Sequence, residues 1–99
     1  MRLTTEQAKS ICRLALQVAG DDVQVRVFGS RLDDTARGGD LDLMLEFREP
    51  VHNPSLLAAQ FSAKVMRLMQ GRKVDVVLKA PNLLRLPIHD VALSGGQLL

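Results

Sequence analysis

The stretch that decides the fold is GGDLDLMLEF, Gly38 to Phe47, which combines a buried-strand pattern with two acidic residues. Apolar residues alternate with other residues along Leu41–Phe47, which predicts a β-strand. Asp40 and Asp42 stand two positions apart, and side chains at that spacing point to the same face of a strand. At a separation of about 6.6 Å and an effective dielectric near 20, two such charges repel by roughly 2.5 kcal/mol. The pair is therefore expected either to bind a cation or to lie fully in solvent.

Two further segments alternate in the same way, Val23–Phe28 and Lys73–Leu78. Each of the three predicted strands has one apolar face and one mixed face. We expect the apolar faces to pack against helices and the mixed faces to lie together on the uncovered side of the sheet. This arrangement brings Asp40, Asp42 and Asp75 into one region of a single open sheet face.

Helical spacing of apolar residues predicts two long helices and a short one. The first begins at a capping box formed by Thr4 and Gln7 and ends at Gly20. The second is capped by either Asn53 or Ser55. The second and third helices are expected at about 56–69 and 88–93, and the tail, 97–99, is expected to add an edge strand.

The length of 99 residues predicts a single domain, residues 1–99. The order of elements predicts an α+β fold in two layers, with a small mixed β-sheet and helices packed on one face. Apolar residues make up 46% of the chain and charged residues 24%, as in globular proteins. No targeting or membrane-spanning segment is recognised, so a cytoplasmic location is expected. The net charge of +2 does not by itself indicate nucleic-acid binding.

Some residue types that often carry function are expected to be structural here. Cys12, the single cysteine, lies in a helical pattern, which favours plain packing over a reactive thiol. His52 and His89 are expected to be exposed or structural rather than catalytic. A further apolar group fits either the core or an interface, including one between copies of the chain: Met44, Met66, Met69 and 83–86.

Three carboxylates on one face provide hard oxygen ligands, which suit Mg²⁺ or Mn²⁺. A D-x-D pair alone is more often a solvated strand edge, and Asp75 on a neighbouring strand is what favours the metal site. Gly29 and Ser30 directly follow the first predicted strand, where glycine lets the backbone approach a ligand and exposed N–H groups can hold phosphate oxygens. A Gly-Ser pair alone does not indicate a phosphate-binding site. This pair is informative because it precedes the predicted strand that carries the aspartates.

The segment FGSRLDDTARGGDLDLMLEF, Phe28 to Phe47, resembles the signature of the minimal nucleotidyltransferases, small members of the DNA polymerase β-like superfamily. Their pattern is G-S, a spacer, D-x-D, and a third acidic residue on a later strand, and Asp75 within KVDVV fits the last part. The resemblance covers nearly the whole chain. It implies the polymerase β-like nucleotidyltransferase fold and transfer of a nucleoside monophosphate from a nucleoside triphosphate, with AMP from ATP as the expected case.

The resemblance also implies a role for each matching residue. Asp40, Asp42 and Asp75 would be the catalytic residues and would bind Mg²⁺ or Mn²⁺. Asp75 would also help to take the proton of the attacking hydroxyl group. Gly29 and Ser30 would hold the β- and γ-phosphates of the nucleotide.

The roles predicted for other residues in and around the motif are less specific. Arg31 follows the Gly-Ser turn and either contacts the nucleotide or is a surface charge. Arg37 either positions the loop or contacts phosphate. Asp33 and Asp34 are expected to cap the loop, and Glu46 shares the open face but is expected outside the metal site because it lies farther along the strand.

Minimal nucleotidyltransferases often pair with a small helical protein of the HEPN class, as antitoxins that move AMP from ATP onto a tyrosine of the toxin. The resemblance implies such a partner here, with a protein hydroxyl as the acceptor. An antitoxin that acts only by forming a complex stays open, as does a small-molecule nucleotidyltransferase such as an antibiotic-modifying enzyme. A D-x-D glycosyltransferase or a phosphatase is the remaining alternative.

Overall fold

A computed structural model describes residues 3–29 and 41–99. Within these ranges the chain forms three helices and a four-stranded sheet, which confirms the predicted α+β class. The elements, in chain order, are α1 (Thr5–Ala19), β1 (Gln24–Phe28), β2 (Leu41–Glu46), α2 (Pro54–Leu68), β3 (Val74–Lys79), α3 (Pro87–Gly95) and β4 (Gln97–Leu98).

The helix ends are fixed by local hydrogen bonds. At the start of α1, the Gln7 N–H donates to the Thr4 hydroxyl and the Thr4 N–H donates to the Gln7 side chain, both at 3.0 Å. This is the predicted capping box. Gly20 ends the helix at a positive φ of 89°. Asn53, rather than Ser55, caps α2 by accepting a hydrogen bond from the Leu56 N–H at 3.4 Å.

The sheet has the strand order β3-β2-β1-β4 and is mixed, as predicted. β1 is antiparallel to both β2 and β4, whereas β2 and β3 are parallel. A parallel pair needs a long crossover, and α2 supplies it between β2 and β3. The predicted edge strand at the end of the chain is present as β4, which pairs with Arg26 and Val27 of β1.

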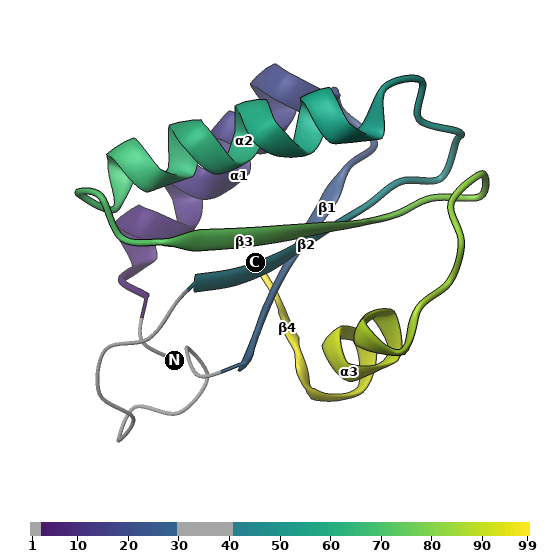
Figure 1. Ribbon diagram of the computed structural model, residues 1–99. Coiled ribbons are helices and arrows are strands. Elements are labelled where there is room, and N and C mark those ends of the chain that lie inside the picture. Colours follow the sequence, from purple (N-terminus) through teal and green to yellow (C-terminus); the bar gives the residue numbers. More distant parts are fainter. Residues whose placement is uncertain (1–2, 30–40) are drawn as a thin grey trace.

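The main core lies between the sheet and the two long helices. Figure 1 shows α1 and α2 together above one face of the sheet. On that face Leu41, Leu43 and Leu45 of β2 have no exposed surface, as the alternation predicts. The helices contribute their predicted apolar stripes, and the fully buried members of those stripes include Ile11, Phe61 and Val65.

The prediction that the helices pack on one face is wrong for α3. This helix lies on the opposite face of the sheet from α1 and α2 (Figure 1). Ala92 of α3 forms a second buried cluster there with Phe28 of β1 and Met44 of β2. The alternation correctly assigns Phe28 and Met44 to the mixed face, but it does not tell which helix covers them.

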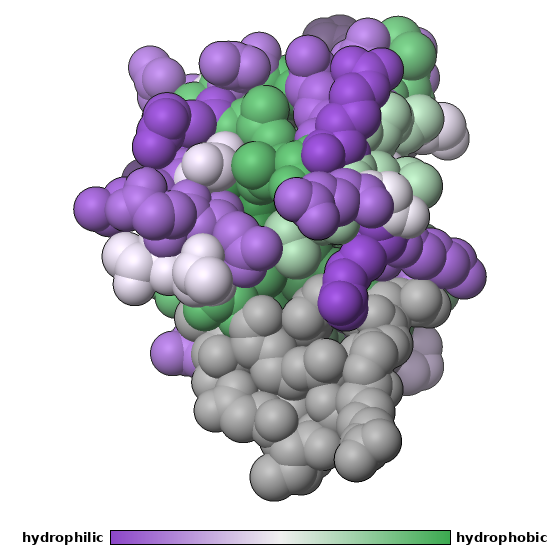
Figure 2. Space-filling view, turned by 90° about the vertical axis from the view of Figure 1, so that its left-hand side faces the viewer, coloured by the Kyte–Doolittle hydropathy of each residue, from purple (hydrophilic) through white to green (hydrophobic). Residues whose placement is uncertain are grey.

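The ambiguous apolar residues divide between core and surface. Met44 and Met69 are buried, and Met66 packs against the main core, so these three methionines are core residues. Leu84 and Leu86 remain exposed in the segment before α3. On the face shown in Figure 2, hydrophobic side chains form a band bordered by hydrophilic ones, which is ordinary because much protein surface is apolar. None of the helices in the described ranges is long and apolar enough to cross a membrane.

Candidate active site

Asp42 and Asp75 lie opposite each other on the parallel strands β2 and β3. The register pairs Asp42 with Asp75 and Leu43 with Val76. Strands in a sheet are about 4.8 Å apart, and paired residues present their side chains to the same face. That face is the one turned away from the main core, because Leu41 and Leu43 on one strand and Val74 on the other are buried beneath α1 and α2.

The two carboxylates differ in exposure. Asp42 is half-buried, whereas the Asp75 side chain keeps 50% of its surface exposed. The Lys73 ammonium lies 4.0 Å from an Asp75 carboxylate oxygen and is itself mostly exposed. At such distance and exposure the ion pair is weak and screened by solvent, so it leaves the Asp75 oxygens accessible to another cation.

The backbone of Gly29, at the end of β1, lies very close to the Asp42 carboxylate. Phe28 pairs with Asp42 in the sheet, so Gly29 is the first residue past that pair. Its φ is +76°, and a Cβ placed on it would overlap a carboxylate oxygen of Asp42 and lie 3.3 Å from its Cγ. Glycine is therefore required here for two reasons: the positive φ and the lack of space.

The structure brings together Gly29, Asp42 and Asp75 of the predicted site. Asp40, Ser30 and Arg31 lie outside the described residues, as do Asp33, Asp34 and Arg37. In the described ranges, no three side chains of histidine, cysteine, aspartate or glutamate come together as a metal-binding group. The carboxylate pair on β2 and β3, beside a glycine turn at the end of β1, is thus the geometry on which a functional assignment can rest.

The family of the chain follows from its sequence as a whole. A family model described as "Nucleotidyltransferase domain" matches residues 5–95, which extend from the first residue of α1 to the last residue of α3. The chain belongs to the nucleotidyltransferase domain family. This family lies within the polymerase β-like superfamily, so the resemblance seen in the motif is confirmed at that level. No curated protein matches the chain.

In this nucleotidyltransferase domain, the far end of the mixed face is occupied by an ion pair. The Arg26 guanidinium donates from Nε to the Glu46 carboxylate at 2.7 Å, and both side chains are largely buried. Glu46 follows Asp42 by four residues, or about 13 Å along a strand. Glu46 is thus already paired with a cation and distant from the Asp42–Asp75 pair.

The nucleotidyltransferase domain also has a wall beside this face that the sequence pattern did not predict. The cluster of Phe28, Met44 and Ala92 is buried where an open surface was expected, and Val77 packs against it. Met44 follows Asp42 by two residues and Val77 follows Asp75 by two, so the apolar wall borders the carboxylate pair. The signal in the sequence was the group of apolar residues, Phe28, Met44 and Val77, on a face that otherwise carries polar side chains.

Neither histidine contributes to the described part of the site. His52 is exposed in the loop before α2. His89 is buried in α3, where its Nδ1 accepts a hydrogen bond from the Leu86 N–H at 2.9 Å. Nε2 therefore has the hydrogen and donates to the Leu78 carbonyl at 2.8 Å. His89 joins α3 to the edge of β3 and has a structural role.

Proposed function

We propose that the chain is a metal-dependent nucleotidyltransferase that transfers AMP from ATP to a hydroxyl group of a partner protein. The family supports transfer of a nucleoside monophosphate. The observation that supports the catalytic assignment best is the register of Asp42 against Asp75, beside a glycine that leaves room for the Asp42 carboxylate. A cytoplasmic location, where ATP and Mg²⁺ are available, is part of the proposal.

The donor set fits a divalent cation. Asp42 and Asp75 offer carboxylate oxygens from adjacent strands, and Mg²⁺ and Mn²⁺ prefer oxygen ligands. Asp40, two residues before Asp42 in the sequence, is proposed as the third ligand. When bound, the cation would lower the pKa of the attacking hydroxyl and offset negative charge on the triphosphate.

The remaining steps are assigned to residues of the chain. Gly29, Ser30 and Arg31 are proposed to hold the triphosphate at the end of β1, because Gly29 has no side chain to keep the phosphates away. The acceptor oxygen bonds to the α-phosphorus as the bond from that phosphorus to the pyrophosphate oxygen breaks. The hydroxyl proton passes to the Asp75 carboxylate, which is accessible because half of its side chain is exposed.

The partner is proposed from the resemblance to the minimal nucleotidyltransferases. A small helical protein of the HEPN class would supply the acceptor hydroxyl, and the chain would be the antitoxin of a toxin–antitoxin pair. A chain that neutralises such a toxin by complex formation alone would not need the carboxylate pair. Catalysis and complex formation can therefore be separated by variants of Asp42 and Asp75.

The test uses the purified chain, ATP, Mg²⁺ and the product of the adjacent gene, followed by mass spectrometry of that product. We expect the mass of the partner to rise by one or more AMP units. Asp42→Asn and Asp75→Asn should abolish the increase without preventing complex formation. Asp22→Asn, which makes the same change of charge at an exposed turn after α1, should leave the increase intact. An unmodified partner that is nevertheless neutralised would show that the chain acts by binding alone.

A further inference from the structure

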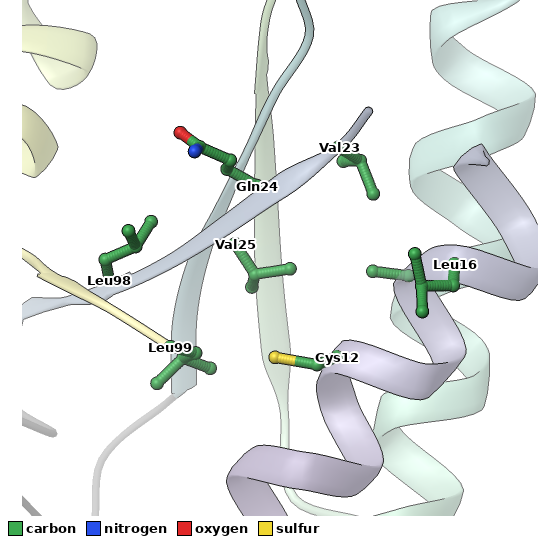
Figure 3. A pocket seen from close by; sticks show the side chains of 8 residues that line it. Cys12, Leu16, Val23, Gln24, Val25, Leu98 and Leu99 are labelled. Atoms are coloured by element: carbon green, nitrogen blue, oxygen red, sulfur yellow. The ribbon is translucent and has the colours of Figure 1, made fainter. Parts of the chain in front are cut away.

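A groove runs between α1 and the edge of the sheet that β4 forms. It consists of two adjoining hollows of about 210 Å³ and 340 Å³, which share Cys12, Leu16 and Leu99. The first lies between α1 and β1, and Figure 3 shows Val23, directly before β1, and Val25 of β1 pointing toward the helix across it. We name these two hollows together the α1–β4 groove. Of the residues proposed for the site, those that the structure describes, Gly29, Asp42 and Asp75, do not line it.

One face of α1 forms the long wall of the groove. Thr5, Ala8, Cys12 and Leu16 recur at helical spacing along it, and they span about 16 Å at 1.5 Å per residue. Leu16 keeps 47% of its surface exposed, although α1 packs its other apolar face into the main core. The apolar part of this face, from Ala8 to Leu16, thus remains partly uncovered over about two turns beside the buried stripe.

Among the described residues, the charged side chains that line the α1–β4 groove have one sign. Lys9 and Arg13, four residues apart on α1, line the outer hollow. Among the described residues that line either hollow, none is an aspartate or a glutamate. The groove therefore complements a ligand that combines an apolar stripe with negative charge at its side.

We propose that the α1–β4 groove binds an amphipathic helix of a partner protein, with acidic side chains beside its apolar stripe. A helix matches the length of the α1 stripe and packs into grooves of this kind through residues at i, i+3, i+4 and i+7. An added strand would gain little, because β4 has only the two residues Gln97 and Leu98.

The charge and the recessed shape of the α1–β4 groove disfavour two other occupants, a second copy of the chain and a lipid surface. A second copy of the chain that packs α1 against α1 would bring Lys9 and Arg13 close to the same cations of its partner. A lipid surface would need a protruding apolar face, whereas Cys12 and Val25 lie in a recess between helix and strand. The proposal concerns a surface remote from the Asp42–Asp75 pair and does not depend on the proposed nucleotidyl transfer.

The test uses two synthetic helical peptides, each with leucines at i, i+4, i+7 and i+11. One has glutamates at the flanking positions and the other has lysines there. Titrated into the ¹⁵N-labelled chain, the glutamate peptide should shift the amide signals of Ala8, Cys12, Leu16 and Leu99. The lysine peptide should bind at least about tenfold more weakly, since two favourable charge pairs become repulsive.

Two variants keep the test specific. Leu16→Glu, at a half-exposed site that tolerates a polar side chain, should abolish binding of the glutamate peptide while the circular dichroism spectrum is retained. The double variant Lys9→Glu/Arg13→Glu should reverse the preference between the peptides. The proposal is overturned by equal affinity for both peptides, by absence of binding, or by shifts confined to other surfaces. It is also overturned if the chain dimerises through Leu16 or if anionic phosphatidylglycerol vesicles shift the same signals.

Discussion

At the scale of single residues, the backbone conformation of Gly29 and its lack of a side chain leave room for the Asp42 carboxylate of the proposed site. Its φ of +76° strains any other residue, and a Cβ there would displace the Asp42 carboxylate. Gly71 is a matched control, because its φ is +87° and a Cβ added to it would have no other atom within 4 Å. Substitutions at the two glycines therefore separate the effect of backbone strain, which both share, from the effect of crowding the Asp42 carboxylate, which only Gly29 has.

We predict that Gly29→Ala and Gly71→Ala each lower the free energy of unfolding by about 1–2 kcal/mol, because both impose strain at positive φ. Only Gly29→Ala should also weaken ATP binding, since only there does the new methyl group meet Asp42. Urea denaturation and titration with a fluorescent ATP analogue measure the two effects. Equal loss of ATP binding in both variants would show that strain alone matters.

The fold alters the titration of Cys12. Partial burial in the α1–β4 groove raises the pKa of its thiol, because burial disfavours the thiolate. The folded chain therefore holds this proton to higher pH than the unfolded chain does. The resulting contribution to stability is present below the unfolded pKa and is lost as the pH rises through the folded pKa.

We predict that iodoacetamide alkylates Cys12 more slowly in the folded chain, with a pH profile displaced upward from that of the urea-unfolded chain. Mass spectrometry gives the alkylated fraction directly, because the chain has a single cysteine. A folded profile displaced to lower pH would identify an activated thiolate, contrary to the packing role assigned here.

The residue-scale part of the site was partly predictable. Alternation placed Asp42 and Asp75 on the face opposite the buried leucines, and the structure has them there. Alternation gives the face but not the position along it. The direct pairing of Asp42 with Asp75 depends on the register of β2 against β3, which a sequence pattern of period two leaves open.

At the scale of elements, the boundaries that local chemistry controls were predictable and the position of α3 was not. The Thr4–Gln7 capping box and the glycine after α1 act within a few residues, so the sequence displays them directly. The position of α3 depends on contacts with residues distant in the chain, such as Phe28 and Met44. Those contacts have no periodic signal in the segment that forms the helix.

His89 holds α3 to the sheet, and its removal should show this. His89→Ala would leave the Leu86 N–H and the Leu78 carbonyl without their partner. We predict a loss of about 2–3 kcal/mol in the free energy of unfolding, because two backbone groups lose their hydrogen bonds. Urea denaturation at constant pH measures the loss.

His52→Ala is the control, because the same side chain is removed from an exposed loop. Its effect should be within about 0.5 kcal/mol, as for most surface substitutions. Equal effects of the two substitutions would mean that the hydrogen bonds of His89 do not stabilise the attachment of α3.

At the scale of the whole molecule, the proposed site exists only when the sheet is assembled. Gly29, Asp42 and Asp75 are distant in sequence and meet because β2 lies between β1 and β3. The main core and the Phe28–Met44–Ala92 cluster hold this sheet from opposite faces. The mixed character of the sheet followed from the pattern of elements, whereas the strand order and the covering of both faces did not.

The central claim is that Asp42 and Asp75 hold a divalent cation beside Gly29. Paramagnetic broadening of amide signals by substoichiometric Mn²⁺ in the ¹⁵N-labelled chain tests it most directly, because the ion marks its own position even when it binds weakly. We predict selective broadening of the signals of Gly29, Asp42 and Asp75. The effect should be lost in Asp42→Asn and retained in Glu46→Gln, since Glu46 is paired with Arg26 on the same strand face. Broadening that is centred elsewhere, or that survives Asp42→Asn unchanged, would contradict the claim.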